Sequence, residues 1–174
     1  RKQHPLGRHI CNTAGIARFP AQALEFARLG IGMFGVNALE PLTLQPALSF
    51  ETTVSQIRTV PAGEGVGYGA TDASPQPRRI AVVPVGYADG YPRHLSNGKG
   101  HVAINGQLAP VIGKVCMDMT LIDVSALPQV QPGDDVVLFG ASPTLEDVAA
   151  AAGTIPYEII ARIPARVARI HRGG

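Results

Sequence analysis

The stretch HVAINGQLAPV, residues 101–111, decides the fold of most of this chain. Two β-rich runs flank the dipeptide Asn105-Gly106, and these two residue types readily adopt the positive backbone φ angles of a tight two-residue turn. The stretch therefore predicts an antiparallel β-hairpin with Asn105 and Gly106 at its tip.

The same pattern of short β-rich runs and turns continues on both sides of this hairpin. Pro132-Gly133-Asp134 has the composition of a turn. Thr144, with acidic residues after it, predicts a capped helix over Leu145–Ala152 that ends at Gly153. Evenly spaced short strands indicate an antiparallel barrel or sandwich. The expected strands lie within Ser49–Val60, Arg79–Val85, His101–Ile104, Pro110–Val115, Thr120–Val124 and Val136–Phe139.

The first part of the chain has a different pattern. His9–Asn12 reads as a strand, and Asn12 and Thr13 offer helix-capping side chains. A helix is expected from Pro20 to Arg28, and an apolar strand over Ile31–Gly35. One such β-α-β unit cannot close an α/β barrel. We therefore expect a chain cut from a longer one, with a boundary between residues 1–48 and 49–174.

Composition excludes several classes of partner. A net charge of +2 over 174 residues gives no reason to expect nucleic acid or membrane binding. No apolar run approaches the roughly 20 residues that span a bilayer. Cys11 and Cys116 fit no Cys-x-x-Cys or Cys/His metal pattern, so no metal site is expected, and two isolated thiols suit a reducing cytoplasm.

All four tyrosines have a glycine or proline nearby, namely Tyr68, Tyr87, Tyr91 and Tyr157. Such neighbours predict loops or strand ends, where binding and catalytic residues concentrate. On placement alone, four turn tyrosines that cover the ends of a small barrel are the simpler explanation. A phenol has an ordinary pKa near 10, so Tyr68 would need cations or strong hydrogen bonds nearby to act as a base at neutral pH.

Two segments before residue 35 have the composition of anion-binding sites. They are Arg28-Leu29-Gly30-Ile31 and the Asn12-Thr13 pair at a helix start. Taken alone, each segment is better explained by simple helix capping, although two such segments in one unit are more suggestive than either. Core packing likewise accounts for Met117 when it is taken alone.

Taken in order, six motifs resemble the C-terminal half of the pyridoxal phosphate-dependent alanine racemases. They are HxxNTAG (9–15), RLGIGMFG (28–35), GxGYGAT (65–71), GYADGYxR (86–93), GxxCMD (113–118) and PYE (156–158), the last followed by RVxR (166–169). Six motifs in this order and spacing are far more specific than any one short pattern.

The resemblance implies a mainly β fold. Residues 49–174 would form the family's antiparallel β-barrel-like C-terminal domain, and residues 1–48 the last β-α-β piece of an (α/β)₈ barrel. The implied activity is the interconversion of L- and D-alanine through an aldimine with pyridoxal 5'-phosphate, which supplies D-alanine for the bacterial cell wall. The family is cytoplasmic, and it works as a homodimer whose active sites are shared between subunits.

The resemblance also implies residue roles. Tyr68 would be the catalytic base on the L-alanine face, reaching into the partner's site. Arg28 would donate a hydrogen bond to the pyridine nitrogen of the cofactor, because a guanidinium cannot accept a proton there. The remaining roles are the support of that arginine (His9), the cofactor phosphate (Thr13, Gly30, Ile31, Tyr157), the substrate carboxylate (Met117) and the access corridor (Tyr87, Arg93, Asp118).

The sequence departs from the family at its lysines. The family's Schiff-base lysine lies in an upstream segment, and Lys2, Lys99 and Lys114 are poor substitutes for it. Lys114 stands where the family often has arginine, and Thr13 where it usually has serine. We therefore expect residues 1–174 alone to be inactive. A serine racemase-type relative, and a non-catalytic dimerisation or binding module of a larger cell-wall enzyme, remain alternatives.

Overall fold

The predicted hairpin is present. Strands β8 (His101–Ile104) and β9 (Gln107–Ile112) pair antiparallel, with His101 opposite Pro110 and Ile104 opposite Gln107. Asn105 and Gly106 connect them with φ angles of 51° and 76°. These left-handed angles explain why this dipeptide fits the turn.

The computed structural model describes residues 7–36 and 43–172. The chain divides into two units, Arg1–Leu48 and Ser49–Gly174, which we call the amino-terminal and carboxy-terminal units. Each is described separately below.

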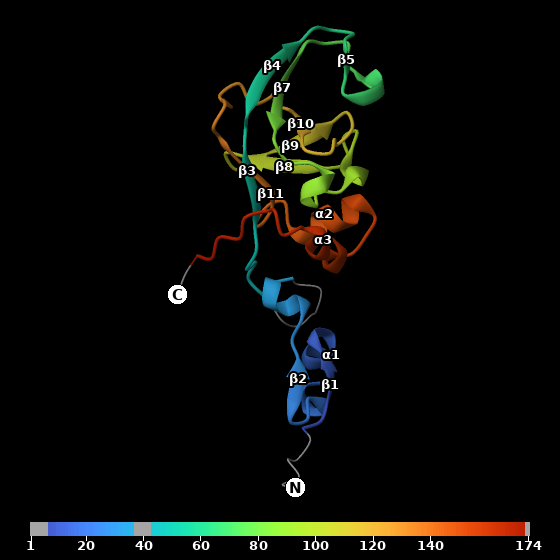
Figure 1. Ribbon diagram of the computed structural model, residues 1–174, viewed down its shortest axis with the longest axis vertical. Coiled ribbons are helices and arrows are strands. Elements are labelled where there is room, and N and C mark those ends of the chain that lie inside the picture. The colour runs from blue at the N-terminus through green and yellow to red at the C-terminus, as the bar shows by residue number, and fades with distance from the viewer. Residues whose placement is uncertain (1–6, 37–42, 173–174) are drawn as a thin grey trace. The chain divides into compact units, whose positions relative to one another are not determined.

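A seven-stranded antiparallel sheet forms the carboxy-terminal unit, in the order β3-β11-β8-β9-β10-β7-β4 (Figure 1). This half-barrel confirms the predicted mainly β, antiparallel fold. The strands not yet given bounds are β3 (Phe50–Thr53), β4 (Gln56–Val60), β7 (Arg78–Val83), β10 (Thr120–Asp123) and β11 (Asp135–Phe139).

The expected single run over Ser49–Val60 is two strands at opposite ends of the sheet. Val54 and Ser55 separate β3 from β4. The Val54 N–H donates to the Asp134 carbonyl at 2.9 Å, and the Ser55 N–H donates to the Val82 carbonyl at 2.8 Å. Since Asp134 directly precedes β11 and Val82 lies on β7, the chain passes from one end of the sheet to the other within two residues.

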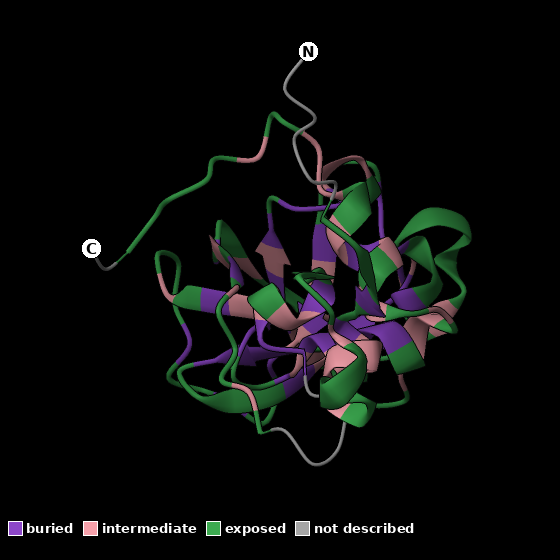
Figure 2. Cartoon of the chain, turned by 90° about the horizontal axis from the view of Figure 1, so that it is seen from below, coloured by how far each residue is buried: buried purple, intermediate pink, exposed green. Residues whose placement is uncertain are grey.

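The core lies between the strands, where the buried segments concentrate (Figure 2). Alternate residues of the strands point inward, as the two-residue period of a strand requires. The rings of Phe50 and Phe139 pack with centroids 5.7 Å apart. Fully buried members include Val83, Val102, Val111, Ile122, Val136 and Leu138.

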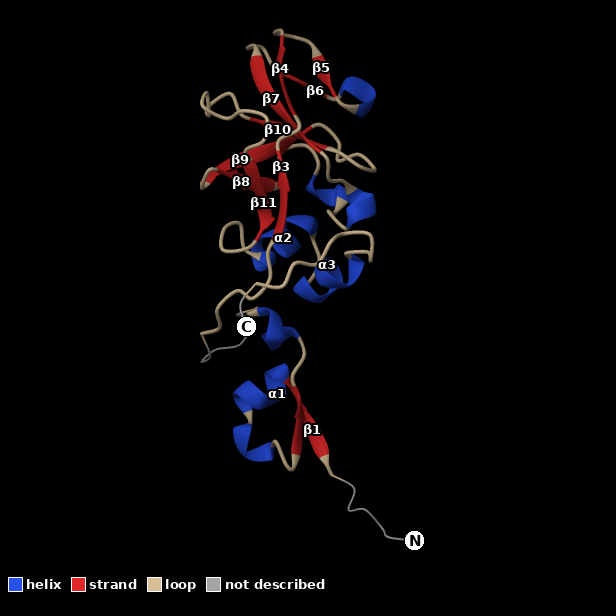
Figure 3. Ribbon diagram, turned by 60° about the vertical axis from the view of Figure 1, so that its left-hand side comes forward, coloured by secondary structure: helices blue, strands red, loops and turns tan. Residues whose placement is uncertain are grey.

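Two α-helices follow the last strand and pack together (Figure 3). Helix α2 (Leu145–Ala152) is the predicted one. The Thr144 hydroxyl accepts from the Asp147 N–H, and Gly153 ends the helix in a left-handed conformation. Helix α3 (Pro156–Arg162) was not predicted, although Pro156 occupies a favoured first-turn position.

A small hairpin carries Tyr68. Strands β5 (Gly65–Val66) and β6 (Asp72–Ala73) pair through two residues each, and the 3₁₀ turn η3 (Tyr68–Ala70) lies between them. Two further 3₁₀ turns, η4 (Tyr87–Asp89) and η5 (Arg93–Leu95), follow β7.

The amino-terminal unit contains a parallel pair, β1 (His9–Asn12) and β2 (Phe26–Arg28), joined through helix α1 (Thr13–Arg18) and the 3₁₀ turn η1 (Pro20–Gln22). Strand β1 and the helix start at Thr13 are as predicted. The helix expected over Pro20–Arg28 is wrong, because Leu24 has a φ of 56° and the residues after it pair with β1.

The strand expected over Ile31–Gly35 is also wrong, since Ile31–Phe34 is a 3₁₀ turn, η2. The second strand of the unit is therefore β2, and Arg28 ends a strand instead of a helix. Within the described ranges, no helix has the length and apolar character needed to cross a bilayer.

Candidate active site

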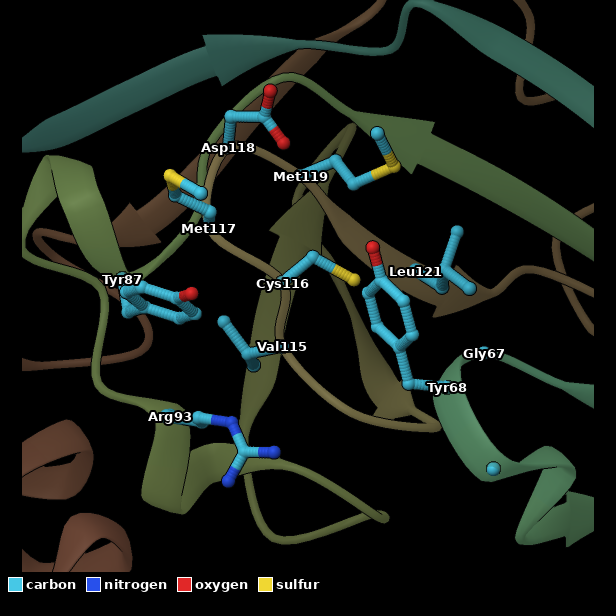
Figure 4. Close-up of a pocket in the computed structure, with 11 residues that line it drawn as sticks. Gly67, Tyr68, Tyr87, Arg93, Val115, Cys116, Met117, Asp118, Met119 and Leu121 are labelled. Atoms are coloured by element: carbon cyan, nitrogen blue, oxygen red, sulfur yellow. The ribbon is translucent and has the colours of Figure 1, made fainter.

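A cavity of about 840 Å³ opens on the carboxy-terminal unit (Figure 4). It lies where the Tyr68 hairpin, the turns after β7 and the segment between β9 and β10 meet. Its lining consists of Gly67, Tyr68, Gly69, Tyr87, Arg93, Val115, Cys116, Met117, Asp118, Met119 and Leu121.

Tyr68 stands on one wall of this cavity. Gly67 and Gly69 flank it with φ angles of 73° and 78°, a left-handed conformation that favours glycine. The two glycines allow a sharp turn that presents the phenol outward. Tyr68 is 72% exposed, and its ring faces the cavity across from Tyr87 and Arg93 (Figure 4).

The segment after β9 forms the opposite wall. The backbone N–H of Tyr87 donates to the Cys116 carbonyl, and that of Ala88 donates to the Met117 carbonyl, both at 2.9 Å. Gly86 permits this approach, because a Cβ atom there would lie 2.3 Å from the Cys116 carbonyl oxygen. Turn η4 therefore lies directly on the backbone of the wall.

The Asp89 side chain also holds turn η4 in place. The Asp89 carboxylate accepts from the Gly86 N–H at 2.9 Å and from the Arg166 guanidinium at 2.7 Å. Asp89 is largely buried and Arg166 is mostly exposed. The contact ties the segment after α3 to the turn that positions Tyr87.

Two charged side chains that line the cavity, Asp118 and Arg93, shift the pKa of the Cys116 thiol in opposite directions. The pKa of Cys116 is raised by burial and by the negative charge of Asp118, while the positive charge of Arg93 lowers it. A raised pKa keeps the thiol protonated at neutral pH. Cys116 therefore contributes a soft, uncharged surface between Tyr68 and Met117.

Five residues singled out from the sequence come together in this cavity: Tyr68, Tyr87, Arg93, Met117 and Asp118. Tyr157 lies elsewhere in the same unit, as the second residue of α3. The expected loop position is thus wrong for Tyr157. Tyr91 does lie in a loop, but its side chain is only 1% exposed.

Thr13 and Gly30 meet in the amino-terminal unit. The Thr13 hydroxyl oxygen accepts from the Gly30 N–H at 2.9 Å and from the Gly32 N–H at 3.4 Å. A Cβ atom at Gly32 would lie 2.7 Å from the Thr13 methyl group, so only glycine leaves this space open. Both N–H groups are therefore used by the Thr13 oxygen, while the Thr13 O–H remains able to donate to an anion such as a phosphate.

Arg28 and His9 lie on the paired strands of the same unit. The Arg28 guanidinium donates to the Ile10 carbonyl at 3.4 Å. In the β1–β2 register, His9 is opposite Phe26 and Arg28 is opposite Asn12. Both side chains are exposed, and Ile31 is buried at the start of η2.

Six cavity residues were not assigned to a site from the sequence: Gly67, Gly69, Val115, Cys116, Met119 and Leu121. A usable signal existed for two of them. Thr120 and Ile122 are fully buried, so the two-residue period of β10 turns Met119 and Leu121 to the opposite face. That alternation could have placed both beside the Cys116-Met117 motif.

Known proteins with this sequence pattern are alanine racemases. The sequence profile of the family described as "Alanine racemase, C-terminal domain" matches residues 47–171. The alanine racemase of Desulfosudis oleivorans is 39% identical over 96% of this chain and 45% of its own length. Alanine racemase 1 of Clostridium acetobutylicum is 44% identical over 94% of this chain and 45% of its own length.

Solved structures of alanine racemases also match this chain. An alanine racemase from a D-cycloserine-producing Streptomyces lavendulae matches with a TM-score of 0.89 and 36% identity, over 98% of this chain and 47% of its own. The alanine racemase of Bartonella henselae, solved with covalently bound pyridoxal phosphate, matches with a TM-score of 0.88 and 34% identity, over 96% and 47%. This chain spans about half the length of these relatives. By the match over residues 47–171, it belongs to the alanine racemase family and carries the C-terminal domain of that family.

Proposed function

We propose that this chain is the C-terminal half of an alanine racemase, which interconverts L- and D-alanine with pyridoxal 5'-phosphate. The cavity carries this proposal. It gathers Tyr68, Tyr87, Arg93, Met117 and Asp118 from separate loops around one space of about 840 Å³. A phenol, a guanidinium and a carboxylate around one cavity suit a zwitterionic amino acid.

Tyr68 is the proposed base. Its Oη atom would take the α-proton from L-alanine, or return a proton to the same face in the reverse direction. The cofactor, when bound, withdraws electrons from the α-carbon and so weakens the C–H bond. Tyr68 and Tyr87 both line the cavity, and Tyr68 is the more exposed of the two phenols, at 72% against 46% (Figure 4).

The other cavity residues would bind and select the substrate. The Met117 backbone would contact the substrate carboxylate. Arg93 and Asp118 line the cavity with opposite charges, so a net-neutral zwitterion would meet no overall repulsion. With Tyr87 they would form the access corridor, which favours small amino acids by its width.

The amino-terminal unit would hold the cofactor. Thr13, Gly30 and Ile31 would bind its phosphate, with Tyr157 as a further donor, and the Thr13 hydroxyl, which the Gly30 and Gly32 N–H groups hold in place, supports this. Arg28 would donate to the pyridine nitrogen, with His9 behind it. A base for the D-alanine face is not among the cavity-lining residues of the described chain, and we expect it from another part of the enzyme.

Residues 1–48 would form the last β-α-β unit of an (α/β)₈ barrel, and residues 49–174 the complete β-domain. Parallel strands in such barrels are covered on both faces. In β1 and β2 most side chains are exposed, including Ile10 at 65% and Phe26 at 61%. Neighbouring barrel elements would cover these apolar surfaces.

The active enzyme would be a homodimer, in which the cavity of one copy completes the cofactor site of the other. Exposed apolar groups around the cavity support this arrangement. Tyr68 is 72%, Met117 58% and Met119 41% exposed, and apolar surface concentrated in one place marks an interaction site.

Replacing Tyr68 tests the proposed activity. In the natural polypeptide that carries this sequence, Tyr68→Phe removes the Oη atom and keeps the ring. The exchange of the L-alanine α-proton with deuterated solvent should fall about 10²- to 10⁴-fold, because one acid-base group is lost. The cofactor absorbance band should remain.

Tyr91→Phe is the matched control, since Tyr91 is buried outside the cavity and should leave exchange unchanged. Normal L-alanine exchange in Tyr68→Phe would refute the role of Tyr68. If the unaltered protein with cofactor turned over serine but not alanine, the serine racemase-type alternative would hold. Turnover of neither substrate would favour a binding module.

A further inference from the structure

Asp72 lies four residues after Tyr68 and uses both of its carboxylate oxygens. Oδ1 is 2.7 Å from Nη2 of Arg78, and Oδ2 accepts from the Gly113 N–H at 2.9 Å. The two side chains are largely shielded, with 19% of Asp72 and 12% of Arg78 exposed. A shielded carboxylate with two such partners is held in one place.

Arg78 connects this carboxylate to the seven-stranded sheet. It is the first residue of β7, and its Nη2 also donates to the Asp72 backbone carbonyl at 3.2 Å. Its Nη1 is 4.0 Å from the Asp123 carboxylate on the neighbouring strand β10. One guanidinium therefore binds both the backbone and the side chain of Asp72, from a position fixed by two strands.

Gly113 connects the same carboxylate to the far wall of the cavity. It follows β9 and precedes the lining residues that begin at Val115. A Cβ atom on Gly113 would lie 3.1 Å from the Val66 carbonyl oxygen and 3.6 Å from the Gly67 Cα atom. The backbone before Tyr68 thus passes within van der Waals distance of the backbone before the opposite wall.

We infer that Asp72 and Arg78 are positioning residues for Tyr68. They hold the β5–β6 hairpin against Gly113 and so set the distance between Tyr68 and the Cys116–Met119 wall. Neither residue lines the cavity, so both act only through the loops that they join.

The hairpin needs this support because its own strands are short. Two residue pairs join β5 to β6, and so small a hairpin is only marginally stable by itself. Val66 adds an apolar contact by packing with Ile80 and Ile112. That contact anchors the start of the hairpin, whereas the Asp72–Arg78 pair anchors its end.

The position of Tyr68 matters for the rate of the proposed reaction. A displacement of about 1 Å at a reacting group reduces a rate by roughly 100-fold. The predicted effect on turnover rests on the proposed function. The predicted effect on loop order rests on the structure alone, so the two can be tested separately.

The test compares Asp72→Ala, Asp72→Asn and Arg78→Met with the control Arg79→Met, in the natural polypeptide with cofactor. Arg79 is the neighbouring residue on β7, and its guanidinium donates to the carbonyls of Leu127 and Val130, away from the Tyr68 hairpin. The control therefore removes a partly buried arginine whose hydrogen bonds to Leu127 and Val130 do not involve Asp72.

Amide hydrogen exchange over residues 65–73 and at Gly113 is the first measurement. Exchange should accelerate by about tenfold or more in Asp72→Ala and Arg78→Met, and stay unchanged in Arg79→Met. Asp72→Asn should give an intermediate result, because its amide oxygen can still accept from Gly113. Unchanged protection over 65–73 in a folded Asp72→Ala protein would overturn the inference.

Steady-state kinetics with L-alanine is the second measurement. In the two disruptive variants, kcat should fall roughly 10- to 100-fold with little change in KM or cofactor affinity, and Arg78→Lys should recover part of the loss. An equal loss in Arg79→Met would show a general effect on folding and would overturn the inference. Absence of turnover in the unaltered protein would instead refute the proposed function, and the exchange measurement would still decide the positioning role.

Discussion

Tyr91 buries a hydroxyl group that has no hydrogen-bond partner among the described residues. The side chain is 1% exposed, and a Cβ atom at Gly100 would lie 3.1 Å from its Oη atom. Burial raises the pKa of this phenol above its ordinary value, because the phenolate would lose its hydration. The unpaired hydroxyl, unlike the buried ring, therefore lowers the stability of the unit in which Tyr91 lies.

Tyr91→Phe should stabilise the protein. The substitution removes a buried donor without a partner and keeps the ring, so the free energy of unfolding should rise by about 1 kcal/mol at pH 7. Urea unfolding followed by far-UV circular dichroism measures this change. A decrease of similar size would show that the hydroxyl has a partner in solution.

The same residue predicts a loss of stability at high pH. Above pH 10 the unfolded phenol releases its proton while the folded one, with its raised pKa, keeps it. The folded state then binds more protons than the unfolded state, so stability falls by about 1.4 kcal/mol per pH unit. The difference between Tyr91→Phe and the unaltered protein should therefore grow from pH 8 to pH 11, and a constant difference would contradict the assigned burial.

No single residue identified the site from the sequence, because turn formation or core packing explained each one alone; the order and spacing of six motifs pointed to these residues. Tyr68 between two glycines, and the Cys116-Met117-Asp118 segment, lie in the cavity. The ion pair of Asp72 and Arg78 could not be found, because the residues meet only when β6 and β7 fold together. Tyr91 shares the Gly and Pro neighbours of the other tyrosines, and only packing distinguishes it.

Turn η4 depends on one glycine. Gly86→Ala would place a Cβ atom 2.3 Å from the Cys116 carbonyl oxygen and 2.5 Å from the Met117 carbonyl oxygen. Because both neighbours are backbone atoms, η4 must move off the wall. We expect a loss of about 1–3 kcal/mol in unfolding free energy and a lower kcat/KM for alanine, since Tyr87 moves with the turn.

Gly133→Ala is the control variant for Gly86→Ala. A Cβ atom at Gly133 meets nothing within 4 Å, but the φ of 95° is strained for alanine. This variant should lose about 1 kcal/mol of stability and keep full activity. Urea unfolding and alanine turnover are measured for both variants, and normal kcat/KM in Gly86→Ala would contradict the coupling of η4 to the cavity.

Elements were predictable where a local signal fixed them. The hairpin at Asn105-Gly106 and the helix capped by Thr144 are confirmed. The helix predicted over Pro20–Arg28 is wrong, because the pairing of Phe26–Arg28 with β1 overrides the helical pattern of this segment. The split of Ser49–Val60 into β3 and β4 depends on which neighbours each half meets, which local propensity does not contain.

At the scale of the whole molecule, the exposed side chains of Tyr68, Met117 and Met119 around the cavity predict the assembly. We call these three residues the cavity rim. Met119→Asp places a charge on that rim, where Met119 is 41% exposed. If a second copy covers the rim, burying this carboxylate is costly and the dimer dissociation constant should rise at least about tenfold. Sedimentation analysis of the natural polypeptide with cofactor measures it.

Leu108→Asp is the control for assembly. Leu108 lies on β9, is 55% exposed and does not line the cavity. This variant should sediment like the unaltered protein. Equal weakening in both variants, or none in Met119→Asp, would show that the cavity rim is not the dimer interface.

The two-residue passage from β3 to β4 has a consequence for solubility. Both terminal strands of the sheet belong to one continuous piece of chain, and Ser55 at its middle is exposed. Unpaired strand borders can recruit strands from other molecules and so start fibrils. A proteolytic cut at Ser55 would remove the covalent link between these two strands, which keep their pairing with β11 and β7, and we expect the cleaved protein to scatter more light on incubation than the intact protein.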